Sequence, residues 1–323
     1  MAILEQKIQP ELATFANDIL EGLTATPKFL PSRYFYDEKG DKLFQQIMEL
    51  PEYYLTRTEF KILQENKELV LHEMDGQAFD LVELGAGDGY KTKILLRYFL
   101  SQKADFQYMP IDISANVLDA LSRELHNAWP ALKVEPVEGE YFSALGKIDQ
   151  LSNRKKLVLF LGSNIGNMTT ARAVSFLSQL RGKLRVGDKL LIGFDRKKDP
   201  ATILAAYNDA QGVTKAFNLN LLHRINKSFD ADFDVSSFMH YPTYNPLTGD
   251  TKSYLVSTKS QDVQLGLLDK TIHFDAWEAI DMELSKKYDE HSMEWLAQAS
   301  GFEVVSQLTD DQQYFTDAIW KAI

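Results

Sequence analysis

The sequence predicts an α/β protein with a doubly wound parallel sheet and a second, smaller α+β domain. Apolar strand-like runs alternate with helix-like segments from Phe79 to Asp195, a pattern typical of a parallel sheet with helices on both faces. A glycine-rich turn at Gly85 directly follows the first of these strands. The alternation stops near Arg196, where segments that look antiparallel replace it, so a second architecture is expected there.

The first 55 residues favour short helices, interrupted by an aromatic and proline-containing loop from Pro27 to Tyr36. A firmer helix is expected from about Arg57. Thr56 and Glu59 have the spacing of a capping box, in which two side chains satisfy backbone N–H groups at the start of a helix.

The alternating region predicts five strands with helices between them. Helices are expected from Lys91, after Ser114 and at Thr169, since serine and threonine are good N-cap residues. The strand from Lys156 to Gly162 is the most hydrophobic, as expected of a central strand buried on both faces. The five expected strands are 79–84, 106–112, 134–138, 156–162 and 189–195.

The region after Arg196 predicts one helix, around Ile203 to Asn208, followed by antiparallel strands near Tyr254 and Thr271. Strand-like segments return near the C-terminus, at 302–306 and 314–320. We therefore expect a cofactor-binding α/β core of residues 60–195 plus 286–323. Residues 1–59 plus 196–285 are expected to form the domain that covers the substrate.

Composition excludes several classes of protein. The chain has 323 residues and no cysteine, so a disulfide framework, a thiolate metal site and a cysteine nucleophile are excluded. A net charge of −11 argues against a nucleic-acid partner. The opening stretch from Met1 to Lys7 is mixed in charge and predicts no signal peptide, and no apolar run approaches the ~20 residues of a membrane span. A cytoplasmic protein is expected, and nothing in the sequence demands more than a monomer.

The glycine turn reads Glu83-Leu-Gly85-Ala-Gly87-Asp-Gly89. Glycines at this place allow a tight turn and a close approach of the backbone to a ligand. Tyr90 stands where the dinucleotide fingerprint needs its third glycine, so the turn instead resembles the first motif of S-adenosylmethionine-dependent methyltransferases. The alternative is a structural turn without a ligand.

Two further positions suit this cofactor. Asp112 ends the second strand, and its carboxylate can accept two hydrogen bonds from ribose hydroxyls. Glu140 and Tyr141 follow the third strand, where they are expected beside the adenine. A surface carboxylate and a packed ring are the alternative interpretation of this pair.

Six segments together resemble the histidine-specific methyltransferase family, and the resemblance spans the chain from about residue 25 to its end. The segments are Leu30–Gly40, Leu50–Glu59, Leu161–Asn167, Ala206–Asn218, Asp230–Asp234 and Glu283–Tyr288. The resemblance implies a Rossmann-like class I methyltransferase core with a two-part substrate domain. It also implies S-adenosylmethionine as cofactor and trimethylation of the α-amine of L-histidine to hercynine, as in ergothioneine biosynthesis.

The resemblance assigns roles to matching positions. The cofactor would be bound by Gly85, Gly87, Lys91, Asp112, Glu140 and Tyr141. Tyr36 and Asn167 would hold the reacting amine and act as the catalytic pair. Tyr53 and Tyr207 would bind the substrate carboxylate, and Glu283 with Ser285 the imidazole. Ser253 departs from the family, in which a methionine lines the side-chain pocket.

The chemistry of these residue types agrees with such roles. A neutral amide such as that of Asn167 can accept a hydrogen bond from an amine without favouring the ammonium form as a carboxylate would. Glu283 and Ser285, read as part of a strand, lie on one face, where they can accept from and donate to two imidazole nitrogens. Turn, core and solvated-face roles are the alternatives for Asn167, the tyrosines and the Glu283–Ser285 pair respectively.

Metal and hydrolase chemistry find no support. The six histidines show no paired ligand spacing, and neither a GxSxG elbow nor a Walker motif is present. The leading hypothesis is Nα-methylation of a small-molecule substrate, L-histidine. The others are N-methylation of another amino acid or an indole-bearing amine, a non-catalytic sensor of cofactor or amino acid, and, weakest, a dehydrogenase.

Overall fold

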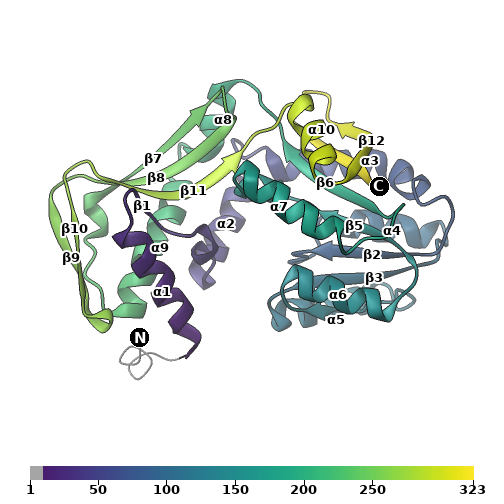
Figure 1. Ribbon diagram of the computed structural model, residues 1–323, viewed down its shortest axis with the longest axis horizontal. Coiled ribbons are helices and arrows are strands. Elements are labelled where there is room, and N and C mark those ends of the chain that lie inside the picture. The colour runs from purple at the N-terminus through teal and green to yellow at the C-terminus, as the bar shows by residue number, and fades with distance from the viewer. Residues whose placement is uncertain (1–9) are drawn as a thin grey trace. The chain divides into compact units, whose positions relative to one another are not determined.

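The computed structural model describes residues 10–323, except for the side chains of 10–11 and 149–151, and divides the chain into two compact units (Figure 1). One unit contains the chain up to Tyr54 and Lys198–Ser285, and the other contains Leu55–Lys197 and Lys286–Ile323. The sequence analysis put the three boundaries at 59/60, 195/196 and 285/286, against 54/55, 197/198 and 285/286 in the structure. The mixed-charge opening stretch lies outside the described residues.

The larger unit is built on a seven-stranded sheet in the order β12-β13-β6-β5-β2-β3-β4. Five strands, β2 to β6, run parallel, whereas β13 is antiparallel to both β6 and β12. The prediction of a doubly wound parallel sheet is confirmed for β2 to β6. The added edge is antiparallel because a short turn joins β12 to β13, and a tight connection pairs strands antiparallel. The strands are β2 (Phe79–Leu84), β3 (Phe106–Asp112), β4 (Val137–Glu138), β5 (Lys155–Phe160), β6 (Lys189–Asp195), β12 (Phe302–Thr309) and β13 (Phe315–Ala322).

Helices cover both faces of this sheet, as the doubly wound class requires (Figure 1). Side chains alternate along each strand, so Leu81 joins the apolar cluster under α3, α4 and α5, while Val82 joins the cluster under α6, α7 and α10. The helices are α3 (Leu55–His72), α4 (Thr92–Ser101), α5 (Ala115–Ala128), α6 (Tyr141–Leu151), α7 (Thr170–Arg181) and α10 (Glu290–Ala299).

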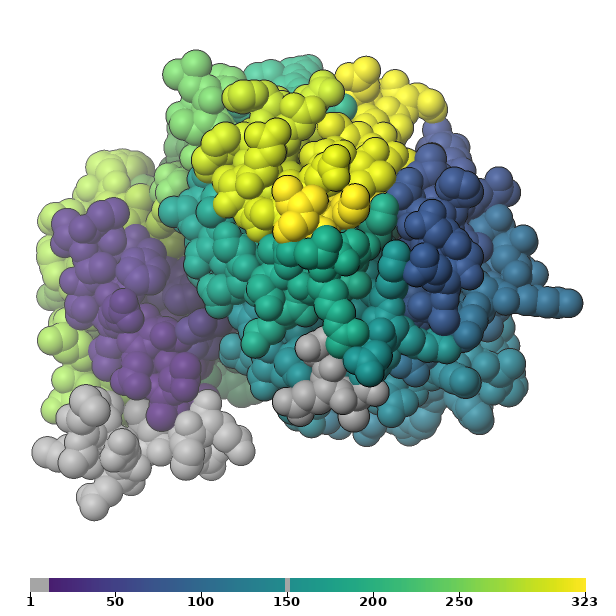
Figure 2. All heavy atoms as spheres, turned by 45° about the vertical axis from the view of Figure 1, so that its right-hand side comes forward, coloured from purple at the N-terminus to yellow at the C-terminus, as the bar shows by residue number. Residues whose placement is uncertain are grey.

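The last residue, Ile323, is held to this unit by backbone and side-chain contacts. Its amide donates to the carbonyl oxygen of Gly301 at 3.1 Å, and Arg181 of α7 donates from Nε to its carbonyl oxygen at 2.9 Å. The yellow C-terminal segment accordingly lies against teal residues of the same unit in Figure 2.

Two of the predicted helix starts are confirmed, and a third is wrong. Ser114 and Thr169 each cap their helix, accepting from a backbone N–H three residues later at 3.4 Å. The capping box at Thr56 and Glu59 does not form, because α3 already begins at Leu55 and the Glu59 carboxylate is buried. The weak third strand is shorter than expected, with β4 beginning only at Val137.

The smaller unit holds a four-stranded sheet in the order β1-β11-β8-β7 and a separate two-stranded sheet of β9 and β10. The β7–β8 and β9–β10 pairs are antiparallel, as expected, whereas β1 runs parallel to β11. The elements are α1 (Pro10–Thr24), β1 (Lys28–Phe29), α2 (Glu38–Glu49), α8 (Pro200–Tyr207), α9 (Val213–Phe229), β7 (Phe238–Asn245), β8 (Asp250–Ser257), β9 (Gln261–Leu265), β10 (Lys270–Phe274) and β11 (Ala279–Lys286).

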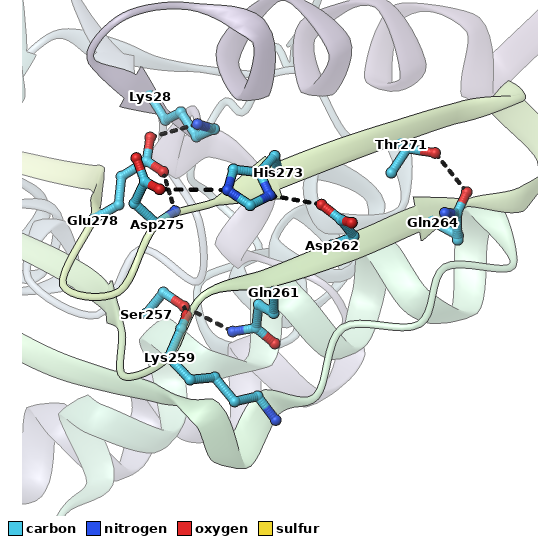
Figure 3. Close-up of polar contacts among 10 residues, drawn as sticks. All are labelled: Lys28, Ser257, Lys259, Gln261, Asp262, Gln264, Thr271, His273, Asp275 and Glu278. Carbon is cyan, nitrogen blue, oxygen red and sulfur yellow. Dashed lines mark hydrogen bonds and ion pairs between the residues drawn. The ribbon is translucent and has the colours of Figure 1, made fainter.

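Polar contacts hold the β9–β10 hairpin together on its exposed side (Figure 3). His273 of β10 contacts Asp262 of β9 at 2.7 Å through Nδ1, and Asp275 at 3.4 Å through Nε2. These hydrogen bonds raise the pKa of His273, because both carboxylates favour the charged imidazolium. Thr271 and Gln264 add a second cross-strand hydrogen bond of 2.8 Å.

The single helix expected in the 196–285 region is one of two, because α9 was missed. Asn218, Asn220 and Asn226 all lie within α9, and asparagine is a poor helix former. Each asparagine donates to a specific partner: Asn220 to Asp37 at 2.8 Å, Asn226 to the carbonyl of Phe233 at 2.9 Å, and Asn218 to that of Thr214 at 3.0 Å. Tertiary contacts therefore stabilise a helix that local propensity disfavours. No helix in the described part of the chain is long and apolar enough to cross a membrane.

Candidate functional site

The glycine turn adopts a backbone that other residues rarely accept. Gly85, Gly87 and Gly89 have φ values of 72°, 53° and 64°, in the left-handed region. The amides of Gly85 and Ala86 both donate to the carbonyl of Ile111 on β3, at 2.9 and 3.2 Å. The turn is thereby held against the end of the neighbouring strand.

A hollow of about 250 Å³ opens beside this turn, lined by Gly85, Asp112, Ile113, Glu140 and Tyr141. Asp112 ends β3, and its two carboxylate oxygens accept from the amides of Ser114 at 3.0 Å and Gly87 at 3.3 Å. These bonds fix the carboxylate at the rim of the hollow. Four of the six predicted cofactor residues therefore line one cavity.

Tyr141 and a positive φ both favour glycine at position 85. A Cβ atom there would lie 2.9 Å from the Tyr141 hydroxyl oxygen, so the ring would have to shift, and the φ of 72° would strain any other residue. Burial raises the pKa of Tyr141, and the negative charge of Asp112 adds to this, so the hydroxyl stays protonated. Glu140 is exposed at the N-cap of α6, and its side chain forms no cap hydrogen bond there.

Lys91 is tied to a residue that the sequence assigned to helix capping. Its ammonium group forms an ion pair with Glu59, whose side chain is 1% exposed. The second carboxylate oxygen of Glu59 accepts from the amide of Gly162 at 2.7 Å. Glu59 therefore connects a predicted cofactor residue to the loop after β5. The sequence did carry a signal, since Glu59 is four residues from Leu55 and three from Ile62 on the apolar face of α3.

Glu83 is buried beneath the glycine turn. It accepts hydrogen bonds from the Thr92 hydroxyl at 2.5 Å and from the Tyr108 hydroxyl. Burial raises the pKa of Glu83 to about 7, despite these hydrogen bonds and the positive charge of Lys91. These buried hydrogen bonds link Glu83 on β2 to Tyr108 on β3 and to Thr92 at the start of α4.

Asn167 lies on the loop after β5, at the end of the short helix η2 (Asn164–Asn167). The loop is tightly anchored, because a Cβ atom at Gly166 would lie 2.8 Å from the carbonyl oxygen of Lys286. Ser163 accepts from the amide of Asp195 at 3.0 Å. The side chain of Asn167 is exposed and forms no hydrogen bond with the described residues, so its amide is available to a ligand.

The smaller unit carries the other predicted substrate residues. Tyr36 packs edge-on against Phe44 and Phe217, with ring centroids 5.5 and 5.6 Å apart. Its surface is 47% exposed, yet its hydroxyl is desolvated. This burial raises the pKa of Tyr36 strongly, and the nearby charge of Glu283 raises it further.

Tyr207 and Ser285 are joined directly. The Tyr207 hydroxyl, at the end of α8, donates to Oγ of Ser285 on β11 at 2.7 Å, and both residues are buried. Glu283 precedes Ser285 by two residues on β11. The structure thus brings Tyr36, Glu283, Tyr207 and Ser285 into one neighbourhood.

Tyr53 and Ser253 are the remaining residues of the smaller unit that the sequence analysis singled out. Tyr53 is half-buried, and its ring lies 6.3 Å from Phe44, which also contacts Tyr36. Ser253 lies on β8 opposite Pro242 and is 1% exposed, and its Oγ atom has no hydrogen-bond partner in the part of the chain that the structure describes. A buried hydroxyl without a partner is costly unless water or a ligand satisfies it.

The predicted site residues therefore form two sets, one on each unit. Asn167 and the cofactor residues belong to the larger unit, and the three tyrosines, Glu283 and Ser285 belong to the smaller. Among the described residues, no cluster of histidine, aspartate and glutamate could hold a metal ion. The catalytic and binding roles stay predictions.

Comparison with known proteins identifies relatives over almost the whole chain. Residues 15–322 match the profile of histidine-specific, S-adenosylmethionine-dependent methyltransferases. The chain is 39% identical over 271 residues to the histidine N-alpha-methyltransferase of Mycolicibacterium smegmatis, covering 84% of this chain and 83% of that protein. It is 37% identical over 294 residues to the protein of the same name from Mycobacterium tuberculosis, covering 91% and 90%.

A more distant relative has a different substrate in its name. The 4-dimethylallyltryptophan N-methyltransferase of Aspergillus fumigatus is 26% identical over 311 residues, covering 90% of this chain and 88% of that protein. N-methyl transfer is thus common to these names, whereas the amine that accepts the methyl group differs.

Proposed function

We propose that this chain, which belongs to the histidine-specific, S-adenosylmethionine-dependent methyltransferases, transfers three methyl groups to the α-amine of L-histidine and forms hercynine. Membership makes the chain an N-methyltransferase with S-adenosylmethionine as cofactor, so the dehydrogenase hypothesis is wrong. The product is the first intermediate expected of an ergothioneine-type biosynthesis. The larger unit would bind the cofactor and the smaller unit the amino acid.

The observation that carries the choice of histidine is the polar cluster around Glu283. Its negative charge acts on the Tyr36 hydroxyl, and Ser285 on the same strand accepts from Tyr207. A carboxylate and a hydroxyl side by side match an imidazole, which offers one N–H donor and one acceptor nitrogen. An indole has a donor and no acceptor nitrogen, so it would use only half of this pair.

The hollow beside the glycine turn fits S-adenosylmethionine. Gly85 lines the hollow with bare backbone, so a ligand can approach it closely. Asp112 would accept from the ribose hydroxyls, because two backbone amides already orient its carboxylate. Glu140 and Tyr141 would border the adenine, and Lys91 the amino-acid end. When bound, the cofactor supplies an electrophilic methyl group on its sulfonium sulfur.

The chain's own residues would prepare the amine. Nitrogen reacts through its lone pair, so the substrate ammonium must release a proton to water before each transfer. The raised pKa of Tyr36 keeps its hydroxyl neutral, and a neutral hydroxyl favours the ammonium less than a carboxylate would. The exposed amide of Asn167 would serve in the same way, with its position fixed by the Gly166 contact.

Three transfers require the amine to turn while the rest of the substrate stays bound. Binding of the carboxylate by Tyr53 and Tyr207, and of the imidazole by Glu283 and Ser285, would leave the nitrogen as the mobile group. As methyl groups replace N–H groups, hydrogen bonds from nitrogen are lost, so these distant contacts would retain the intermediates.

The second candidate is N-methylation of another amino acid or of an indole-bearing amine. Two observations favour it: a relative named for a tryptophan derivative, and Ser253 with its unpaired buried hydroxyl. A small serine leaves room for a larger side chain than a methionine would.

The deciding test is mass spectrometry of the protein incubated with S-adenosylmethionine and each of the twenty amino acids. A gain of three methyl groups on histidine alone is expected. Glu283→Ala should raise the KM for histidine ~10- to 100-fold while cofactor affinity stays the same, since a charged hydrogen bond is lost. Asp281→Asn is the matched control, because Asp281 lies on the same strand and pairs with Lys252.

Methylation of a different amino acid would replace the first candidate with the second. Unchanged histidine affinity in Glu283→Ala would contradict the imidazole assignment. Cofactor binding without any methylated product would favour the sensor hypothesis.

A further inference from the structure

A second and larger groove lies on the larger unit between α3 and α4. Its volume is about 520 Å³, within the usual range of small-molecule sites. It shares no lining residue with the cofactor hollow. Its lining residues are Phe60, Gln64, Lys67, Tyr90, Lys93, Ile94, Arg97, Tyr98 and Ser101.

Two contacts between the helices mark the ends of the groove. At one end the rings of Phe60 and Tyr90 stack, with centroids 5.0 Å apart and planes inclined by 26°. At the other end the ammonium of Lys67 lies 5.7 Å from the ring centroid of Tyr98. Phe60 and Lys67 are two helical turns apart, so the groove is roughly 10 Å long.

The groove is basic, although the chain as a whole is acidic, with a net charge of −11. Lys93 is paired with Glu124 at 2.6 Å. Among the described residues, neither Lys67 nor Arg97 forms an ion pair with a carboxylate. These two positive charges are therefore not paired with a carboxylate, although the Lys67 ammonium donates to the carbonyl oxygen of Gln64 at 2.7 Å and Glu68 contacts Tyr98.

The aromatic end of the groove is open to a ligand. Tyr90 is 53% exposed although it stacks on Phe60. An exposed aromatic pair offers a flat surface on which a planar ring can stack. The other end offers cations that bind phosphate groups.

We propose that this groove binds a nucleoside phosphate, with the base stacked at Tyr90 and Phe60 and the phosphate groups against Arg97 and Lys67. The length of roughly 10 Å suits a molecule with a ring at one end and an anion at the other. An extended peptide would place only about three of its residues in such a groove, which is too few for specific recognition.

The test is calorimetric titration of the protein with ATP, adenosine and inorganic phosphate, with S-adenosylhomocysteine present in excess to fill the cofactor hollow. Binding of ATP is expected, and adenosine and inorganic phosphate should each bind at least ~10-fold more weakly, because each lacks one half of the contacts. Lys67→Gln and Arg97→Gln should each weaken ATP binding ~10-fold. Phe60→Leu should weaken the binding of adenosine and the binding of ATP to the same extent.

Lys183→Gln is the control for charge, because Lys183 is exposed on the same unit and outside the groove. It should bind ATP as the unchanged protein does. The proposal is overturned if ATP does not bind, if S-adenosylhomocysteine displaces it, or if the Lys67 and Arg97 variants bind it unchanged. Equal binding of phosphate alone and ATP would reduce the groove to an anion site and would also overturn it.

Discussion

Glu59 and Lys91 form an ion pair across the first helix-to-helix contact of the larger unit, with the carboxylate buried and the ammonium beside Gly162. One carboxylate oxygen contacts the lysine and the other accepts from the Gly162 amide at 2.7 Å. The same side chain thus holds a predicted cofactor residue and the start of the loop that carries Asn167. Two parts of the proposed active site depend on one buried charge.

Glu59→Gln should weaken cofactor binding without unfolding the protein. The amide oxygen can still accept from Gly162, but the charge that positions Lys91 is gone. We expect the Kd for S-adenosylhomocysteine to rise ~10-fold, corresponding to one lost charged hydrogen bond. Calorimetry measures this change directly.

Glu65→Gln is the matched control. Glu65 lies on the same helix, is largely exposed and is paired with Lys61 at 3.7 Å, so its loss should not alter cofactor affinity. If both variants bind the cofactor equally well, Glu59 has only a structural role.

Gly85→Ala tests the hollow itself. The added Cβ would meet the Tyr141 hydroxyl at 2.9 Å and would also strain a backbone with φ of +72°. We expect both a loss of stability of about 1 kcal/mol and a large loss of cofactor affinity. Thermal unfolding and calorimetry separate the two effects.

Gly76→Ala separates strain from space. Gly76 has a φ of +66° and nothing within 4 Å of an added Cβ, so it should lose similar stability but keep its cofactor affinity. Adding Tyr141→Phe to Gly85→Ala removes the clashing oxygen and should restore part of the binding. An equal loss of affinity in Gly76→Ala would show that strain alone is responsible.

The sheet of the larger unit could be predicted because its strands are locally specified. Runs such as Phe79–Leu84 and Lys189–Asp195 are apolar, short and bounded by turn residues, and the structure places both at the predicted limits. The helix α9 could not be predicted in this way, because it contains three asparagines, and one of them, Asn220, finds its partner only at Asp37, far away in the sequence.

The candidate site likewise contains some residues that could be predicted from the sequence and others that could not. Gly85 and Asp112 could be chosen because their positions after strands identify them. Glu59 was assigned to a helix cap, since only the folded chain brings Lys91 and Gly162 to its carboxylate. The tyrosines were chosen by family resemblance alone, because a sequence with 14 tyrosines gives no local reason to prefer one.

The Tyr207–Ser285 hydrogen bond can be measured by a double-mutant cycle. Tyr207→Phe, Ser285→Ala and the double variant remove the donor, the acceptor and both. We expect a coupling of about 1 kcal/mol in the free energy of unfolding, the usual value for one buried hydrogen bond. Both single variants should raise the KM for histidine while leaving the Kd for S-adenosylhomocysteine unchanged. Additive losses would mean that the two side chains act independently.

His240 should make the smaller unit sensitive to acid. It lies on β7 opposite Leu255, and its buried Nε2 atom has no hydrogen-bond partner among the described residues. Burial lowers the pKa of His240 to about 4 from its ordinary 6.5. The negative charge of Asp209 opposes this shift, and the positive charge of Lys215 adds to it.

The direction of the pH effect on stability follows from the lower pKa of His240 in the folded chain than in the unfolded chain. Between pH 6.5 and 4 the unfolded chain takes up a proton at this position and the folded chain does not, so the stability present above pH 6.5 is lost as the pH falls. The loss should approach about 3 kcal/mol near pH 4. His240→Leu should flatten this part of the stability curve, measured by urea unfolding at a series of pH values. His126→Gln is the control, because His126 is an exposed histidine of α5, and this variant should leave the stability curve unchanged. If stability falls as steeply in His240→Leu as in the unchanged protein, other groups cause the acid sensitivity.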